Sequence, residues 1–452
     1  MAKRAEFITK TGAIAATVGS AVGLGNIWRF PYEAGNNGGG AFLLIYLICV
    51  FAVGIPVMVS EFIIGHSTHK NPKGAIKHYT TNKVAMLVPY LCILASIMIL
   101  SFYSVVAGWI MEYMFSSLMG TLSDHTPQEY STMFSGFVSN PWRPLWWMFV
   151  FLAINFWVLK RGVQKGIEKI SNILMPLLFV LLIAFCINSC FLPEAGKGLK
   201  FLFTPDFSKV TPSTLIGAMG QAFFSLSIGL GCMLTYSSYF PKHTPLVKSA
   251  TISAMLDTLV AILASVMIFP VVFSYGFSPE AGPKLVFEVL PSIFTKFPLS
   301  GFWCTIFFLL LFFASLSSTI SMSEIFISFV CEEHKMRRTK ATVLNTVIAL
   351  GLGTLCCLSF GPLSDLTILD NTIFDLFNNI SSNILLPIGG IAFSLFVGWG
   401  IKWEIVVKEL TDDGKRKITL LKPLIFCIRV VAPTAVIIIF LSGLGLFNFI
   451  LK

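Results

Sequence analysis

Long apolar stretches recur along the whole chain of 452 residues. Residues 41–60 carry no charge, and residues 424–451 carry only Arg429. Each stretch exceeds the roughly 18 apolar residues that suggest a membrane-spanning helix. Only 12% of all residues are charged, which is about half the share found in soluble proteins. The sequence therefore predicts a polytopic membrane protein and excludes a soluble multidomain enzyme, a disordered chain and a secreted disulfide scaffold.

Charged or glycine- and proline-rich breaks divide the chain into eleven candidate spans, at residues 12–35, 41–65, 86–118, 143–160, 166–190, 213–240, 247–276, 299–331, 340–359, 372–400 and 422–450. Most of the 32 Lys and Arg residues fall in the N-terminal tail and in the loops on the same side as that tail. Because cytoplasmic loops are enriched in Lys and Arg, this pattern predicts an inward N-terminus and an outward C-terminus. The positions of the Lys and Arg residues behind the net charge of +10 thus indicate the orientation of the chain in the membrane. We infer no nucleic-acid partner from this charge.

Two of the predicted spans contain similar glycine-rich sequences. Residues 19–25 read GSAVGLG, and residues 225–231 read SLSIGLG. The copies lie five spans apart, and an odd number of spans inverts the second unit relative to the first. A single such motif would more often permit close helix packing. Matched copies in corresponding spans favour unwound helices that hold a substrate and ions at the membrane midplane.

Further motifs identify a family resemblance. Residues 19–31, GSAVGLGNIWRFP, are followed by NGGGAF at 37–42, YSVVAGW at 103–109, GQAFFSLS at 220–227 and ASLSS at 314–318. Together they closely resemble the neurotransmitter:sodium symporter family, particularly its bacterial amino-acid transporters. The resemblance implies an all-α, leucine-transporter-like fold in one transmembrane domain, 1–452, with spans 1 and 6 unwound. The two inverted five-span repeats would cover residues 12–190 and 213–400, with an extra span at 422–450.

The resemblance also implies two sodium sites. Sodium prefers oxygen ligands, which carbonyls, hydroxyls, amides and carboxylates supply. The first site, completed by the carboxylate of the substrate, would use Ala21, Asn26, Ser225 and Asp257. The second site would use Gly19, Val22, Ala314, Ser317 and Ser318.

The substrate would lie in an uncharged and mostly apolar pocket. By the same resemblance its residues are Ser20, Ala21, Leu24, Gly25, Ile99, Tyr103, Phe224, Ser225, Ser227, Leu230, Ser318 and Met322. Monoamine-transporting relatives carry an aspartate where this chain has Gly23, so we expect a substrate that brings its own carboxylate. A charged side chain would be costly to desolvate there, which favours neutral hydrophobic or aromatic amino acids.

The resemblance also implies residues for an outer and an inner gate, and a residue that takes the place of chloride. The outer gate would be an ion pair of Arg29 with Asp375. The inner gate would be an ion pair of Arg4 with Glu332, near Tyr239 and Ser238. Chloride-dependent relatives place Asn at the position of Asp257. We therefore expect Asp257, with Tyr46, Gln221 and Ser225 around it, to supply the negative charge that chloride supplies elsewhere.

The predicted function is sodium-coupled symport of neutral amino acids by alternating access, across the cytoplasmic membrane of a bacterium. Sodium ions, two in number, are the expected cofactors, and no chloride requirement is expected. The residues suggest no nucleophile and base of an enzyme, and the ten cysteines suggest neither a metal cluster nor a disulfide. Two alternatives stay open: a proton-driven amino-acid carrier of the same fold, and a non-transporting amino-acid sensor.

Overall fold

The computed structural model describes residues 6–122, 125–276, 285–294 and 299–443. Within these ranges the regular secondary structure consists of helices, several of which are joined by single π-helical turns. The helices are α1 (Lys10–Ala21), α2 (Phe30–Asn36), α3 (Gly40–Cys49), α4 (Ile55–Thr68), α5 (Pro72–Tyr79), α6 (Val88–Leu118), α7 (Pro127–Ser139), α8 (Arg143–Lys160), α9 (Lys169–Cys190), α10 (Ala195–Phe203), α11 (Pro212–Ser225), α12 (Cys232–Ser237), α13 (Leu246–Ser274), α14 (Leu290–Phe294), α15 (Ser300–Glu333), α16 (Arg338–Leu358), α17 (Ile373–Ile380), α18 (Leu386–Leu395), α19 (Trp403–Thr411), α20 (Leu421–Phe426) and α21 (Ala432–Gly443).

Among the described residues, eight helical segments are long and apolar enough to cross a membrane. They cover residues 40–68, 85–118, 163–190, 246–274, 301–333, 338–358, 373–400 and 421–442. A ninth arises if α7 and α8, which meet at 74°, count together as one broken span. Each of these segments overlaps a predicted span. Spans 1 and 6 are not among them, and the count of eleven stays a prediction.

The two glycine-rich sequences interrupt helices. α1 ends at Ala21, where Val22 adopts an extended conformation, and the next helical turn begins at Gly25. α11 ends at Ser225, and α12 begins only at Cys232. Between them Gly229 and Gly231 both have φ of +82°, a conformation that residues with a Cβ rarely adopt. The second copy of the motif therefore needs its glycines for backbone geometry.

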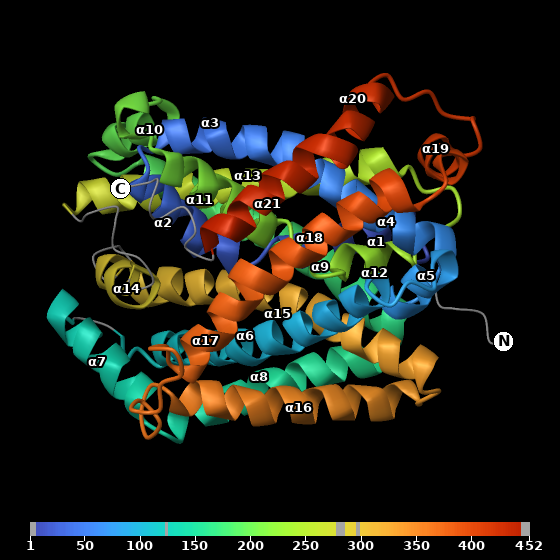
Figure 1. Ribbon diagram of the computed structural model, residues 1–452. Helices are drawn as coiled ribbons and strands as arrows, with labels where there is room; N and C mark the ends of the chain where they lie inside the picture. The colour runs from blue at the N-terminus through green and yellow to red at the C-terminus, as the bar shows by residue number, and fades with distance from the viewer. Residues whose placement is uncertain (1–5, 123–124, 277–284, 295–298, 444–452) are drawn as a thin grey trace.

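Two groups of helices enclose these interruptions. α6, α8, α15 and α16 pack on one another in the lower half of Figure 1, and α3, α10, α11 and α13 lie in the upper half. α1 contacts α13 in the upper group and α15 in the lower group. The interruption after α1 therefore lies between the two groups.

Side-chain hydrogen bonds hold both broken segments in place. Thr9 caps α1 by accepting from the Gly12 N–H, and Glu168 accepts from the backbone N–H groups of Ile8 and Thr9 at 2.8 and 3.1 Å. On α4, the buried Glu61 carboxylate accepts from the N–H groups of Gly229 and Leu234 at 2.6 and 3.1 Å. These carboxylates satisfy donors that a broken helix leaves without intrahelical partners.

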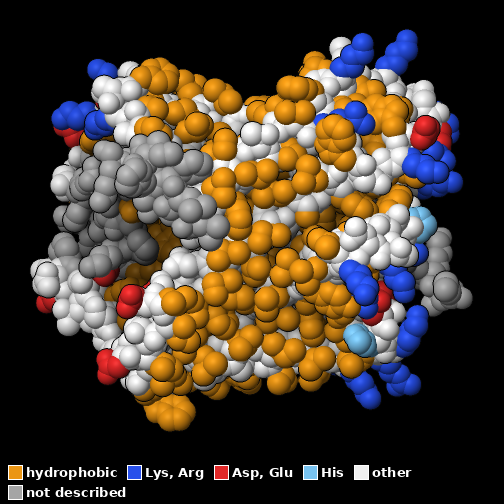
Figure 2. All heavy atoms as spheres, in the orientation of Figure 1, with side chains coloured by type: hydrophobic (Ala, Val, Ile, Leu, Met, Phe, Trp, Pro, Cys, Tyr) orange, Lys and Arg blue, Asp and Glu red, His pale blue; other side chains and the backbone are white. Residues whose placement is uncertain are grey.

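Side chains on the surface are sorted along the length of the bundle. In the face shown in Figure 2, hydrophobic side chains cover the middle of the molecule, and Lys and Arg side chains gather mainly at the end near the N-terminus. Large apolar side chains such as Ile48, Phe51 and Trp399 are exposed on the surface of the bundle. A broad exposed apolar band of this kind suits a lipid environment.

Candidate functional site

Three polar residues from distant parts of the chain meet at the interruption after α1. The Asn26 side-chain nitrogen donates to Ser225 Oγ at 2.8 Å and to Asp257 Oδ1 at 2.8 Å. Ser225 Oγ donates to Asp257 Oδ2 at 2.7 Å. All three side chains are buried. The structure thus brings together the side chains predicted for the first sodium site, and the Ala21 backbone ends the helix beside them.

Asp257 lies in the middle of the apolar helix α13. In the described part of the chain its carboxylate forms no ion pair with Lys, Arg or His and is held by neutral groups, with Tyr46 also nearby. Gln221, predicted to lie around Asp257, donates to the Gly25 carbonyl at 2.9 Å. Burying a carboxylate without a cation is costly. A small cation that coordinates oxygen would offset this cost.

The residues predicted for the second sodium site also lie together, between α1 and α15. Ser318 Oγ donates to the Val22 carbonyl at 3.1 Å, and Ser317 Oγ donates to the Ala314 carbonyl at 3.0 Å. Gly19 faces Ser317 so closely that an added Cβ would lie 3.4 Å from the Ser317 Cβ. Hydroxyls and carbonyls of this set are hard oxygen donors, as a sodium ion prefers.

Most of the predicted substrate residues line a single cavity beside these two clusters. The lining consists of Ala21, Gly23, Gly25, Ile99, Tyr103, Phe224, Ser225, Ser227, Leu230, Ser318, Met322 and Leu386. Ser20 and Leu24 do not line it but adjoin it, since the Ser20 carbonyl accepts from Ser227 Oγ and the Leu24 N–H donates to Tyr103 Oη, each at 2.9 Å. Leu386 was missed because none of the motifs that carry the family resemblance lies in α18.

Gly23 has no space for a side chain in this arrangement. A Cβ there would lie 2.8 Å from both Tyr103 Oη and Ser318 Oγ. An aspartate at this position would displace both hydroxyls. The glycine therefore keeps the polar end of the cavity free for groups that a ligand supplies.

A second cavity, of about 410 Å³, lies next to the first. Tyr103 and Phe224 line both cavities and therefore separate them. Arg29 and Asp375, the predicted outer gate, both line the second cavity. The ion pair present is instead between Arg29 and Glu33, at 3.8 Å, and the Arg29 guanidinium lies 4.8 Å from the centre of the Phe224 ring.

Glu33 was not predicted, although its position one helical turn after Arg29 is the spacing at which opposite charges pair. Asp375 accepts from Thr372 Oγ1 at 2.7 Å at the start of α17. In this arrangement Arg29 and Asp375 share a cavity without being an ion pair.

The inner end holds a network that sequence reasoning missed. Tyr239 Oη donates to Glu324 at 2.8 Å, and Arg338 binds the same carboxylate with two nitrogens, at 2.9 and 2.6 Å. Glu324 is fully buried in α15. Its signal in the sequence was a carboxylate within an apolar span, which needs a partner.

Among the predicted inner-gate residues, Arg4 lies outside the described residues. The Glu332 carboxylate accepts from the backbone and side-chain nitrogens of Asn71 at 2.8 and 2.9 Å. Ser238 Oγ donates to the Thr235 carbonyl within α12. Tyr239 and Ser238 directly follow α12, and the inner gate of Arg4 and Glu332 stays a prediction.

Comparison with known proteins identifies the family. The model of the sodium:neurotransmitter symporter family matches residues 4–135 and 132–449. The chain belongs to the sodium:neurotransmitter symporter family. It is 37% identical over 447 residues to the uncharacterized sodium-dependent transporter YhdH of Bacillus subtilis, covering 99% of each chain. It is 35% identical to an uncharacterized sodium-dependent transporter of Haemophilus influenzae, covering 94% of this chain and 95% of that one.

A solved structure extends the comparison to the fold. The crystal structure of MhsT in complex with L-phenylalanine is 41% identical to this chain, with a TM-score of 0.90, and the match covers 98% of this chain and 100% of MhsT. The predicted family and all-α, leucine-transporter-like fold are therefore confirmed. As a member of this symporter family, the protein is a multi-pass membrane transporter that uses sodium, and it is not an enzyme.

Proposed function

We propose that this symporter carries neutral amino acids with hydrophobic or aromatic side chains, together with sodium, by alternating access. The observation that carries the proposal is the buried Asp257 carboxylate, held by Asn26 and Ser225 beside a small cavity with a mostly apolar lining. The carboxylate suits a cation, and the apolar lining suits an uncharged side chain. MhsT, solved with L-phenylalanine, supports the same substrate class.

The polar end of the cavity suits an α-amino acid. Tyr103 and Gly25 both line the cavity, and the start of the helical turn at Gly25 favours an anion such as a substrate carboxylate. The Ala21 and Ser225 carbonyls lie where helices end, and could accept from an ammonium group. On the other side, Ile99, Leu230 and Met322 offer an apolar surface.

Coupling follows if the substrate carboxylate also completes the first sodium shell. A ligand shared by two bound species makes each raise the affinity for the other, by thermodynamic linkage. The cluster of Val22, Ala314, Ser317 and Ser318 would hold a second ion between α1 and α15. That ion would stabilise the packing of α1 on α15.

Alternating access requires both ends to open and close in turn. On the outer side, Tyr103 and Phe224 form the partition between the two cavities, and Arg29 lies above Phe224. On the inner side, Glu324, Arg338 and Tyr239 tie α15 to the end of the α12 segment. We propose these two groups as the outer and inner gates, in place of an isolated ion pair at each side.

The substrate class can be tested by removing the carboxylate alone. In proteoliposomes with an inward sodium gradient, we expect phenethylamine to compete with L-phenylalanine uptake at least about tenfold more weakly than unlabelled L-phenylalanine does, because the amine cannot complete the first sodium shell. Inhibition of radiolabelled uptake measures this. Equal competition by the amine would overturn the shared-carboxylate mechanism.

The same preparation distinguishes the alternative functions. Uptake that requires sodium and is absent in choline supports the symporter. Uptake driven by a proton gradient in choline would indicate the proton-driven carrier. Binding of L-phenylalanine without uptake under either gradient would indicate a sensor.

Chloride independence follows from the fixed charge of Asp257. Ala261 lies four residues later on the same face of α13, where chloride-dependent relatives carry a serine, and both side chains are buried. We expect equal uptake rates in sodium chloride and sodium gluconate at one sodium concentration. A steep loss of uptake in gluconate would contradict the role proposed for Asp257.

The orientation is also proposed. The Lys and Arg side chains gather mainly at the end of the molecule near the N-terminus (Figure 2), which supports a cytoplasmic N-terminus in a bacterial inner membrane. The interruptions after α1 and α11 support two repeats of opposite orientation within one transmembrane domain.

A further inference from the structure

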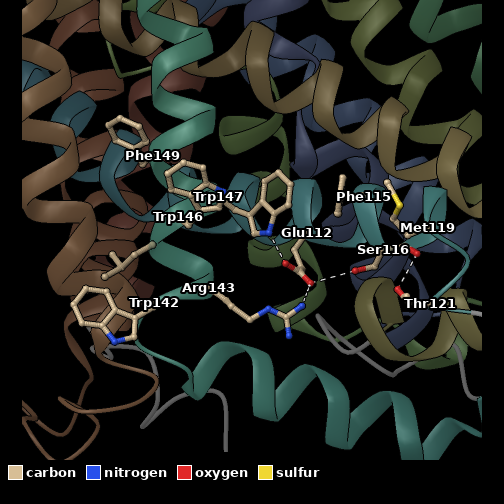
Figure 3. A pocket seen from close by; sticks show the side chains of 11 residues that line it. Glu112, Phe115, Ser116, Met119, Thr121, Trp142, Arg143, Trp146, Trp147 and Phe149 are labelled. Carbon is tan, nitrogen blue, oxygen red and sulfur yellow. Dashed lines mark hydrogen bonds and ion pairs between the residues drawn. The ribbon is translucent and has the colours of Figure 1, made fainter.

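A groove of about 930 Å³ lies between the end of α6 and the start of α8. It shares no lining residue with the two cavities described above. Its walls are mostly aromatic and apolar, and Figure 3 shows them around one polar centre. The lining consists of Glu112, Phe115, Ser116, Met119, Thr121, Trp142, Arg143, Leu145, Trp146, Trp147 and Phe149.

At the polar centre, the Glu112 carboxylate is mostly buried and the Arg143 guanidinium is exposed. Glu112 accepts from Arg143 Nη2, from Trp147 Nε1 and from Ser116 Oγ, the last at 3.1 Å. The Glu112 side chain is 9% exposed, whereas that of Arg143 is 62% exposed. A guanidinium has five N–H donors, and within the described residues only Nη2 of Arg143 forms a hydrogen bond. Arg143 therefore presents donors and positive charge toward the groove.

If α8 is the membrane-crossing part of the broken α7–α8 span, its length puts Arg143 at the level of the lipid headgroups. The 18 residues from Arg143 to Lys160 span about 26 Å, close to the roughly 30 Å of the hydrocarbon core. Trp142 precedes Arg143 at one end, and Trp157 stacks under Arg161 at the other, with 3.4 Å from the guanidinium to the ring centre. Tryptophan and arginine at both ends of a span are typical of the two membrane interfaces.

We propose that this groove binds one phospholipid, with its phosphate on Arg143 and an acyl chain along Trp146, Phe149 and Phe115. A phosphate diester is an anion whose oxygens match the guanidinium donors that Glu112 leaves unused. Trp146, Phe149 and Phe115 are 60%, 49% and 43% exposed, and they give the groove an exposed apolar lining beside Arg143. The lipid would belong to the leaflet opposite the N-terminus, since the start of α8 and the N-terminus lie at opposite ends in Figure 1.

Photocrosslinking tests the site. The full-length protein in detergent micelles is mixed with a trace of phosphatidylglycerol that carries a diazirine on one acyl chain, and the labelled residues are mapped by mass spectrometry. We expect labels on the groove residues of α6 and α8. Trp146→Ala should reduce this labelling about tenfold, whereas Trp157→Ala, at the other end of the same helix, should leave it unchanged. Equal effects of the two variants, or labels spread evenly over all exposed helices, would show ordinary boundary lipid and overturn the proposal.

Competitors test the phosphate contact without changing the protein. Unlabelled phosphatidylglycerol should displace the probe, whereas diacylglycerol with the same acyl chains, and inorganic phosphate alone, should displace it at least about tenfold less well. Because Arg143→Gln alone would leave Glu112 buried without its partner, the matched variant is Glu112→Gln with Arg143→Gln. This double variant should bind phosphatidylglycerol no better than diacylglycerol. Displacement by diacylglycerol equal to that by phosphatidylglycerol in the unaltered protein would overturn the role of Arg143.

Discussion

Replacing Asp257 by Asn should raise the sodium concentration needed for half-maximal uptake about a hundredfold, measured in gluconate so that no chloride can substitute. Asn has nearly the same size and can still bond to Asn26 and Ser225, so the packing around α13 should survive. What is lost is the negative charge that offsets a bound cation. The matching double change, Asp257→Asn with Ala261→Ser, should recover sodium dependence when chloride is added.

The control is an aspartate in a different environment. Asp413 follows α19, and its side chain is 50% exposed and paired with Lys408 at 3.3 Å. Asp413→Asn should leave the sodium dependence within about twofold of the unaltered protein, because exposed ion pairs contribute little. If Asp257→Asn behaved like Asp413→Asn at equal expression, the first sodium site would have to lie elsewhere.

Gly389→Ala should destabilise the protein by about 3 kcal/mol or more and abolish most uptake. A Cβ at Gly389 would lie 1.8 Å from the Gly229 carbonyl oxygen, which belongs to the interrupted segment before α12. Reciprocally, a Cβ at Gly229 would lie 2.2 Å from the Leu386 carbonyl oxygen. Both are contacts with backbone, so no side-chain rotation can relieve them. The melting temperature in detergent and the uptake rate would show the effect.

A second glycine in a helix provides the comparison. An added Cβ at Gly351, on α16, would meet no heavy atom within 4 Å. Gly351→Ala should therefore be neutral or stabilising by up to about 1 kcal/mol, the difference in helix propensity between the two residues. Equal melting temperatures for the two variants would contradict the close approach of α18 to the Gly229 segment.

The matched glycine motifs lie where α1 and α11 end, at Ala21 and Ser225, because backbone freedom is a local property of sequence. The unwinding of spans 1 and 6 at the membrane midplane stays a prediction. The meeting of Asn26 with Asp257, 231 residues away in the chain, followed only from resemblance to a family. Local pattern carries no information on which distant segments touch. The roles of these residues as ligands remain predictions for the experiments above.

Partners that depend on three-dimensional packing escaped prediction. Glu324 and Arg338 belong to consecutive helices, and Glu112 meets Arg143 and Trp147 from the neighbouring α8. The sequence indicates that a carboxylate in an apolar span needs a donor, but several basic residues could serve. Arg29 shows the opposite case, since its partner Glu33 lies one helical turn away and the longer-range Asp375 was predicted instead.

The Glu61 carboxylate joins two pieces of backbone that the chain itself leaves only loosely connected. It binds the Gly229 N–H before α12 and the Leu234 N–H within it, and Gly65 on the same helix lets the Leu234 backbone approach closely. These contacts tie Gly229 and α12 to α4. We expect any bend of the broken span to fall in the few residues between Ser225 and Gly229, where Ser227 has φ of +52°. Because Ser225 and Ser227 also line the cavity proposed for the substrate, a rotation at these residues would change the shape of that cavity directly.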